Sequence, residues 1–495
     1  MNELHNIDRT HPFLDGRPKH LFIDGKWTKS DSEKTFVSID PSTGDDLAVV
    51  FEAEVEDAGR AVRAARKAFP LWKRTKPFDR QQILLKIADL VDQNYEELAT
   101  LESLDYGGPI ARTRSRRRRH VGLIRYYASL AVSIHGQTIE NSIPSDALSY
   151  TVREPVGVVA GIYAWNAPLD MAIWKVAPAL ATGCTIVLKP SLEAALTALR
   201  FGELLQEAGV PDGVVNIIPA GPAVGALLAE HPDVDKVTFT GSTLVGQSIF
   251  RAAAGNLKRL SLELGGKSPN IIFNDADIEA AIPGAAMAVF SNSGQSCAAG
   301  TRLFVQDGIH DEFVRRLADF TRTLRIGDSL DPNTELGPLI SERQLQRVLG
   351  YMRVGVEEGA HLLTGGDRHR VSDTLNGYFA KPTVFANVAD NMSIAREEIF
   401  GPVLSVLRFA NTEEVIERAN SSSYGLAAGI WTTNINTAHH VARSLQAGSV
   451  WVNGYTNLDP AVPFGGYKMS GLGRESGSEH LESFLETKAV TIRIS

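Results

Sequence analysis

A lone cysteine in a short polar segment is the first residue of this chain that could do chemistry. Cys297 ends the stretch Gly294-Gln295-Ser296-Cys297 and is one of two cysteines in 495 residues. A helix-like apolar run precedes the segment and a strand-like run, 302–305, follows it. A thiol at such a boundary can act as a nucleophile. Taken by itself, however, a free cysteine is more often a small buried apolar residue, so other residues must decide.

Two further side chains have the right chemistry to assist a nucleophile. Glu263 lies 34 residues upstream of Cys297, between two leucines and just ahead of Gly265-Gly266. Partial burial there would raise its pKa and suit a general base. Asn166 follows Trp165, and its side-chain amide could donate to a developing oxyanion. Each also has an ordinary explanation, as a solvated strand-end carboxylate or as a helix-entry turn residue.

Two other positions could hold a phosphate or a sugar. Gly241-Ser242-Thr243 ends one predicted strand and opens a helix, whose free N–H groups can bind a phosphate. Lys189 directly follows another apolar strand, where it could reach a sugar hydroxyl. Gln247 stands where a P-loop requires lysine, and no G-x-G-x-x-G fingerprint follows a strand. A serine helix cap and a solvated lysine remain the alternative explanations.

The elements that would position these residues alternate between strand and helix. Short β-branched runs at 156–159, 185–188, 214–217 and 236–240 are each followed by a helix, near 168, 193, 223 and 243. This order predicts an open parallel sheet wound by helices, with ligands at the carboxyl ends of the strands. A second alternating block, after Glu263, predicts another α/β domain. Ahead of both, helices are expected from about 57 and from 79 to about 106.

Composition excludes several classes of function. Apolar residues make up 43% and charged residues 22% of the chain, as in globular proteins, and the net charge of −8 argues against a general nucleic-acid or membrane surface. No secretory signal or membrane-spanning run is visible, and we expect a cytoplasmic protein. The basic run Arg112–Arg119 is expected to be a solvated helix face or a subunit contact.

Taken together, the motifs resemble those of the aldehyde dehydrogenase superfamily over nearly the whole chain. Seven blocks occur in that family's order: Trp165-Asn166, Lys189-Pro190-Ser191, Phe239-Thr240-Gly241-Ser242-Thr243, Leu262-Glu263-Leu264-Gly265-Gly266-Lys267, Gly294-Gln295-Ser296-Cys297, Glu397-Glu398-Ile399-Phe400-Gly401-Pro402 and Pro463-Phe464-Gly465-Gly466-Tyr467-Lys468. The resemblance implies a Rossmann-like cofactor domain, an α/β catalytic domain and a small β oligomerisation arm.

The resemblance also implies a mechanism. Cys297 would attack an aldehyde as a thiolate, and Asn166 would hold the oxyanion. After hydride transfer, Glu263 would activate the water that hydrolyses the thioester, while Glu475 would relay the proton. No metal is expected. The alternatives are a CoA-acylating aldehyde dehydrogenase, which generally lacks the carboxylate at the position of Glu263, and a non-catalytic NAD-binding or structural protein of the same fold.

The cofactor implied is NAD, which the family binds without the usual fingerprint. Leu192 replaces a glutamate that often repels the 2′-phosphate of NADP. This change removes an obstacle to NADP but provides no partner for its phosphate, so NAD should be preferred and NADP tolerated. The expected cofactor contacts are Trp165, Lys189, Ser191, Gly221, Gly225, Phe239, Ser242, Glu398 and Phe400.

The substrate pocket departs from that of relatives that oxidise small aldehydes. Ala167, Ser291 and Leu458 stand where those relatives carry bulky aromatic residues. Met171 and Trp174 would remain as an apolar wall, with Asp170 as a polar exception near the mouth. The resemblance therefore implies a bulky apolar aldehyde: aromatic, terpenoid, or medium to long aliphatic.

The family's domain plan gives the expected boundaries. Residues 1–125 and 146–262 would form the cofactor domain, 263–470 the catalytic domain, and 126–145 with 471–495 the oligomerisation arm. The resemblance suggests a homodimer or a homotetramer, with a small aldehyde as the only other partner.

Overall fold

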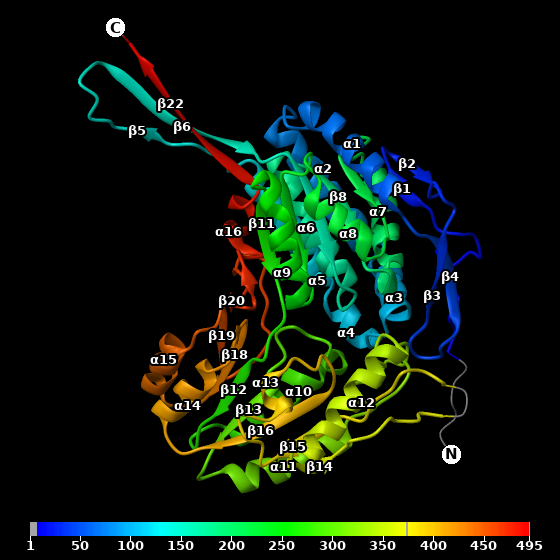
Figure 1. The fold of residues 1–495 in the computed structure, drawn as a ribbon, viewed down its shortest axis with the longest axis vertical. Helices are drawn as coiled ribbons and strands as arrows, with labels where there is room; N and C mark the ends of the chain where they lie inside the picture. The colour runs from blue at the N-terminus through cyan, green and yellow to red at the C-terminus, as the bar shows by residue number, and fades with distance from the viewer. Residues whose placement is uncertain (1–6, 373–374, 495) are drawn as a thin grey trace.

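The computed structural model describes residues 7–372 and 375–494 and contains two α/β layers and a projecting arm (Figure 1). The first layer is an eight-stranded sheet whose five central strands run parallel and whose edges are antiparallel. Its strands, in spatial order, are β2 (Lys26–Thr28), β1 (Leu21–Ile23), β9 (Val215–Ile217), β8 (Thr185–Lys189), β7 (Val158–Tyr163), β10 (Lys236–Thr240), β11 (Arg259–Glu263) and β21 (Gly471–Leu472).

Helices cover both faces of this sheet because alternate side chains of each buried strand point to opposite sides. In β8, Ile186 and Leu188 join one apolar core and Val187 joins the other. The first core is completed by α2 (Pro77–Gln93), α3 (Tyr95–Tyr106), α5 (Arg117–Ala131), α6 (Pro168–Thr182) and α7 (Leu196–Glu207). The second is completed by α1 (Val55–Trp72), α8 (Pro222–Glu230) and α9 (Thr243–Ala252).

The predicted strand-then-helix units are confirmed, with one difference upstream. The long helix expected from residue 79 to about 106 is interrupted at Asn94, which separates α2 from α3. The Asn94 side chain donates to the carbonyl oxygen of Leu90, 2.8 Å away. An asparagine that bonds to local backbone in this way competes with helix continuation.

The second layer is a seven-stranded sheet, parallel except at one edge. Its strands are β14 (His361–Thr364), β15 (Thr383–Ala386), β16 (Val403–Phe409), β13 (Arg302–Gln306), β12 (Pro269–Ile272), β18 (Ala427–Trp431) and β19 (Ser449–Val452). One face packs against α10 (Ile278–Phe290) and α11 (His310–Thr323). The other packs against α12 (Glu342–Glu357), α13 (Ser393–Arg396), α14 (Thr412–Asn420) and α15 (Ile435–Ser444).

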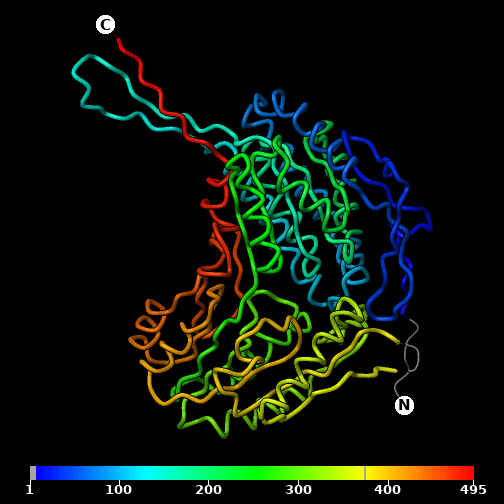
Figure 2. Tube along the Cα trace, viewed as in Figure 1, coloured from blue at the N-terminus to red at the C-terminus, as the bar shows by residue number. Residues whose placement is uncertain are grey.

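The arm is a three-stranded antiparallel sheet that extends away from the body, with the C-terminal strand beside the hairpin (Figures 1 and 2). Its strands are β5 (Thr138–Ile139), β6 (Ala147–Pro155) and β22 (Leu485–Arg493). The pairing differs from the expected boundaries in two ways. Strand β6 belongs to the arm rather than to the cofactor domain, and β21 joins the cofactor sheet rather than the arm.

Shorter elements complete the chain. They are β3 (Thr35–Ile39), β4 (Asp46–Phe51), α4 (Ile110–Ser115), β17 (Tyr424–Gly425), β20 (Tyr467–Lys468), α16 (Gly477–Glu482) and the 3₁₀ turns η1 (Leu192–Ala194), η2 (Ala253–Asn256) and η3 (Ser291–Gly294). Across residues 7–372 and 375–494, none of the helices combines the length and the apolar character that crossing a bilayer requires.

Candidate active site

Cys297 follows a turn whose backbone is held from several sides. Helix α10 ends at Phe290, and Asn292, Ser293 and Gly294 then take positive φ angles of 57°, 54° and 73°. Gly294 is required, because a Cβ there would lie 2.0 Å from the carbonyl oxygen of Gly401. The Ser293 hydroxyl donates to the Gly337 carbonyl oxygen at 2.6 Å. These contacts fix the backbone just ahead of Cys297.

The Cys297 thiol is partly buried in an apolar cluster that includes Ala298, Leu426 and Phe464. Burial raises the pKa of the thiol well above its usual value, and the nearby charge of Glu263 raises that pKa further. The thiol therefore needs a base or a bound ligand to become a thiolate at neutral pH.

Glu263 ends strand β11 and faces the same space. Its side chain is almost fully enclosed, with 4% of the residue exposed, and within the described residues its Oε1 atom has no hydrogen-bond partner. Burial, followed by the charge of Glu475, raises the pKa of Glu263 well above its usual value. A buried carboxylate with a raised pKa and a free oxygen has the properties of a general base.

Glu475 is held by a lysine that the sequence motifs do not identify. Lys175 is fully buried, and its Nζ donates to Glu475 Oε1 at 2.9 Å and to Thr240 Oγ1 at 2.8 Å. The signal was present in the sequence as a single lysine in the otherwise almost wholly apolar helix α6, but lysines are rarely buried. Lys175 therefore connects α6, the end of β10 and the C-terminal segment behind Glu263.

Asn166 lies beside the cysteine turn, in the loop between β7 and α6. Its Nδ2 atom donates to the carbonyl oxygen of Gln295 at 3.0 Å, two residues ahead of Cys297. The Asn292 side chain donates to the same oxygen at 3.0 Å and to the Asn166 carbonyl oxygen at 3.1 Å. A short hydrogen-bonded network, in which Asn292 is an additional member, thus joins the predicted oxyanion donor to the turn that carries the predicted nucleophile.

The residues expected to hold the ribose and phosphates gather at the carboxyl ends of β8 and β10. Lys189 ends β8, and burial lowers its pKa to about 8. A Cβ at Gly225 would lie 3.9 Å from the Lys189 side chain, so these two expected contacts are neighbours. Ser242 caps α9 by accepting a hydrogen bond from the amide of Val245 at 3.4 Å. Gly221 directly precedes α8, a second helix N-terminus at the same edge.

Trp165, Glu398 and Phe400, three of the expected cofactor contacts, also lie close together. The ring of Trp165 meets Phe400 edge to face, with centroids 5.4 Å apart. Glu398 accepts a hydrogen bond from the amide of Gly266 at 3.1 Å, and burial raises its pKa to about 7. A Cβ at Gly241 would lie only 2.5 Å from the Phe239 ring, so the ring packs directly against this glycine. This edge of the sheet offers spare lysine donors, free helix N-termini and an aromatic wall, a set that fits a dinucleotide.

Known proteins are similar to this chain in sequence and in fold. The aldehyde dehydrogenase family's sequence profile matches residues 27–490. The chain is 50% identical to aldehyde dehydrogenase 1 of Tanacetum cinerariifolium, over 96% of this chain and 95% of that protein. It is 49% identical to the mitochondrial aldehyde dehydrogenase of Sus scrofa, over 96% and 91% of the two chains.

The chain belongs to the aldehyde dehydrogenase family. A solved NAD⁺ complex of an aldehyde dehydrogenase from Bacillus cereus superposes with a TM-score of 0.95, at 48% identity over 98% of both chains. The expected fold class, with its Rossmann-like parallel sheet and its second α/β domain, is confirmed.

In this aldehyde dehydrogenase, the expected substrate-pocket residues lie in neighbouring apolar clusters. Met171 and Trp174 are buried in the core beside α6, and Ala167 and Leu458 pack against that core. Leu458 also packs against the cluster that holds Cys297. Phe464 belongs to the same wall, because its ring stacks on Trp174 with centroids 6.2 Å apart. The motif that contains Phe464 was recognised in the sequence, but its place in the wall was not.

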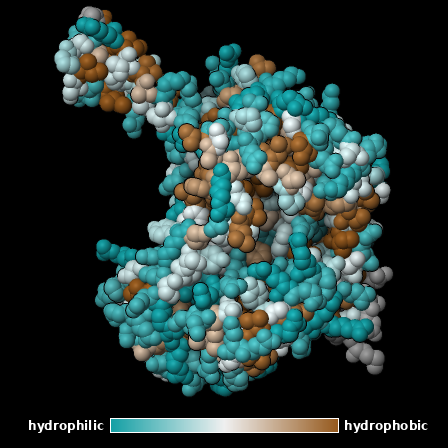
Figure 3. Space-filling view, in the orientation of Figure 1, coloured by the Kyte–Doolittle hydropathy of each residue, from teal (hydrophilic) through white to brown (hydrophobic). Residues whose placement is uncertain are grey.

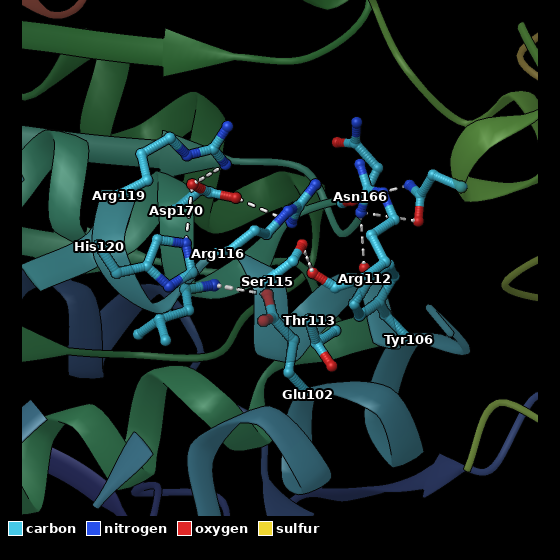
Figure 4. A network of polar contacts seen from close by, with 12 residues as sticks. Glu102, Tyr106, Arg112, Thr113, Ser115, Arg116, Arg119, His120, Asn166 and Asp170 are labelled. Carbon is cyan, nitrogen blue, oxygen red and sulfur yellow. Dashed lines mark hydrogen bonds and ion pairs between the residues drawn. The ribbon is translucent and has the colours of Figure 1, made fainter. Parts of the chain in front are cut away.

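Asp170, expected as a polar exception near the pocket mouth, is a buried member of a charge cluster. It is 1% exposed and pairs with Arg116 Nη1 at 2.8 Å, His120 Nε2 at 2.8 Å and the Arg119 guanidinium (Figure 4). Burial alone would raise its pKa, but Arg119, His120 and Arg116 outweigh burial and hold the pKa well below its usual range. Asp170 therefore acts as a buried counter-charge that ties α5 to α6.

The basic run Arg112–Arg119 is consequently only partly a solvated face. Arg114 and Arg117 are exposed and pair with surface carboxylates, as expected. Arg116 and Arg119 instead turn inward to Asp170, and Arg112 reaches the cysteine turn, where its Nε donates to Ser291 Oγ at 3.2 Å (Figure 4). A run of identical residues cannot reveal which members face inward, because that depends on a partner 51 residues away along the chain.

Proposed function

We propose that this aldehyde dehydrogenase oxidises an aldehyde to the carboxylic acid through a thiohemiacetal and a thioester on Cys297, with NAD as the hydride acceptor. The observation that carries the proposal is the convergence of Cys297, Glu263 and Asn166 from three separate elements onto one enclosed space. These are a nucleophile, a base and an oxyanion donor, the set that acyl transfer through a cysteine requires.

The first half of the reaction forms and oxidises the thiohemiacetal. The Cys297 thiol loses its proton to solvent, and the thiolate sulfur adds to the carbonyl carbon to make a C–S bond as the C=O π bond breaks. The carbonyl oxygen gains the negative charge, which the Asn166 amide and the Cys297 backbone N–H stabilise. As the oxyanion collapses to a C=O group, the former aldehyde hydrogen leaves with its electron pair, leaving a thioester. NAD, when bound, supplies the nicotinamide carbon that accepts this hydride.

The second half hydrolyses the thioester. Glu263 removes a proton from a water molecule whose oxygen adds to the acyl carbon, and the C–S bond breaks to release the acid and the thiolate. The raised pKa of Glu263 supports this assignment, because it brings the base closer to neutral pH. Glu475, fixed by Lys175, lies near enough to influence Glu263 and is the residue we assign to pass the proton onward.

NAD is preferred over NADP in this proposal, and NADP is tolerated. Leu192 carries no charge, but Glu193 beside it and Glu52 both lie close enough to raise the pKa of Lys189. Two carboxylates near the lysine that would meet the adenosine ribose disfavour a 2′-phosphate. A strong NADP preference in steady-state kinetics would contradict this assignment.

The substrate is a bulky aldehyde with a largely apolar body: aromatic, terpenoid, or medium to long aliphatic. The small Ala167 and Ser291 and the partly buried Leu458 support a wide pocket, and Met171, Trp174 and Phe464 support an apolar one. An aldehyde panel with NAD tests this proposal, which a higher kcat/KM for acetaldehyde than for octanal or benzaldehyde would contradict. NADH formation that depends on added CoA would instead favour the acylating alternative.

We propose a cytoplasmic homodimer or homotetramer. The arm presents the nine-residue strand β22, which pairs with β6 along one edge in the described structure, and an open edge can pair with a partner. Leu244 and Phe250 on α9 are also exposed, and Figure 3 shows apolar patches on the upper domain and on the arm. Light scattering coupled to gel filtration tests the assembly, and a monomeric mass would contradict it.

A further inference from the structure

Arg112 is a partly buried cation that has no carboxylate partner among the described residues. Its Nε donates to Ser291 Oγ at 3.2 Å, and its Nη1 donates to Tyr106 Oη at 3.0 Å and to Asn292 Oδ1 at 3.2 Å. All three acceptors are neutral. Within residues 7–372 and 375–494, the Nη2 atom has no hydrogen bond. A partly buried guanidinium without a counter-charge is less favourable than a paired one, and an anionic ligand would supply the missing charge.

The surroundings of Arg112 do not neutralise it. Arg116 and Arg119 are nearby cations that share the single carboxylate of Asp170 (Figure 4). Glu102 is fully buried in the same cluster, and burial raises its pKa, which favours the neutral form. Burial lowers the pKa of Arg112 to about 10, so the side chain still carries its charge at neutral pH. The cluster therefore has a surplus of positive charge.

The unpaired guanidinium lies next to the catalytic constellation. Asn292 accepts from Arg112 and donates to the carbonyl oxygens of Asn166 and Gln295, so one side chain separates Arg112 from the predicted oxyanion site. Ser291, the other contact, is one of the small residues that widen the expected pocket. The Arg112 side chain thus reaches from α4 to the side of the expected pocket where Ser291 replaces a bulky aromatic residue.

We propose that Arg112 binds a carboxylate at the end of the substrate remote from the aldehyde, so that the preferred substrates are semialdehydes with an apolar body and an anionic terminus. This inference rests on the proposed function and narrows its substrate class. A planar guanidinium matches the two oxygens of a carboxylate, and the hydrogen bonds to Ser291 and Asn292 hold the guanidinium in one orientation. The apolar wall of Trp174 and Phe464 would contact the body between the two ends.

The test compares two aldehydes of similar shape, 4-formylbenzoate and 4-methylbenzaldehyde, with the full-length enzyme and NAD. The wild type should prefer 4-formylbenzoate in kcat/KM by about 100-fold, mainly through KM. Arg112→Met should lower kcat/KM by about 100-fold for 4-formylbenzoate and by less than about threefold for 4-methylbenzaldehyde. Arg112→Lys should restore part of the preference for 4-formylbenzoate. Arg114→Met is the matched control, because Arg114 is an exposed member of the same run and should leave the ratio unchanged.

Two readouts separate ligand binding from a bracing role of Arg112. Benzoate should inhibit the wild type competitively against the aldehyde and lose this effect in Arg112→Met, while benzamide should inhibit both enzymes equally. If the wild type prefers 4-methylbenzaldehyde, or if Arg112→Met lowers both kcat/KM values equally, the inference is wrong and the proposed function stands. If neither aldehyde yields NADH and a broader panel also fails, the proposed function itself is wrong.

Discussion

The side-chain amide of Asn166 donates to the carbonyl oxygen of Gln295 at 3.0 Å, and this bond fixes how the amide points toward the Cys297 segment. An amide nitrogen carries two N–H groups, so one remains for a developing oxyanion. The contact joins a loop of the cofactor domain to the turn that carries the nucleophile. The proposed oxyanion donor is thus preorganised by a contact between the two α/β layers, which is the condition under which such donors accelerate acyl transfer.

Replacing this donor tests that role. Asn166→Ala should lower kcat by about 10²–10³-fold, because one preorganised oxyanion donor contributes roughly this much. The KM for NAD should remain within about twofold, since the proposed NAD contacts at Lys189 and Ser242 are left in place. Steady-state kinetics at saturating NAD measure both quantities. A variant with an unchanged kcat would exclude Asn166 from the oxyanion site.

The charge of Glu263 should control the reactivity of the thiol. The charge of Glu263 raises the pKa of Cys297, so Glu263→Gln should lower that pKa and shift the pH midpoint of iodoacetamide alkylation downward. The sign follows because the thiolate no longer forms beside a negative charge. Glu154→Gln, on the exposed arm, is the control and should leave the midpoint where it is. An upward shift in Glu263→Gln would contradict the electrostatic account.

The buried Lys175–Glu475 pair should matter for stability as well as for chemistry. Lys175→Met leaves the Glu475 carboxylate buried without its cation, and this should cost about 3–5 kcal/mol. Lys488→Met removes an exposed ion pair with Glu154 and should change stability by less than about 1 kcal/mol. Thermal unfolding midpoints compare the two variants. The double variant Lys175→Met/Glu475→Gln should recover part of the loss, and equal midpoints for Lys175→Met and Lys488→Met would show that the pair contributes nothing.

Glu193 should contribute to the choice of cofactor. Its carboxylate accepts a hydrogen bond from Ser191, pairs with Arg343 and lies close enough to act on Lys189. Glu193→Gln should raise the ratio of kcat/KM for NADP to that for NAD by about tenfold, because a negative charge facing the 2′-phosphate is removed. Glu207→Gln, near the far end of α7, is the control. No change in the ratio would assign cofactor choice to other residues.

Much of the fold follows from local sequence patterns, whereas the charge network does not. The parallel strands were predictable because buried strands such as β8 contain a short β-branched, apolar run and are followed closely by helix starts. The proposed nucleophile, base and oxyanion donor each lie in a short motif at the end of an element. By contrast, the Asp170 cluster depends on pairing between α5 and α6, and the partners of Lys175 are 65 and 300 residues away. Sequence alone therefore does not reveal the buried partners of Asp170, and it leaves Arg112 in a solvated run.

The most direct test of the central claim is the mass of the enzyme during one turnover. Glu263→Gln mixed with NAD and 4-methylbenzaldehyde should release about one NADH per subunit in a rapid burst, and acid quenching should show Cys297 carrying the acyl group as a thioester. Cys297→Ala should show neither, while it still binds NAD. A burst without an acyl adduct on Cys297, or sustained turnover by Cys297→Ala, would contradict the mechanism.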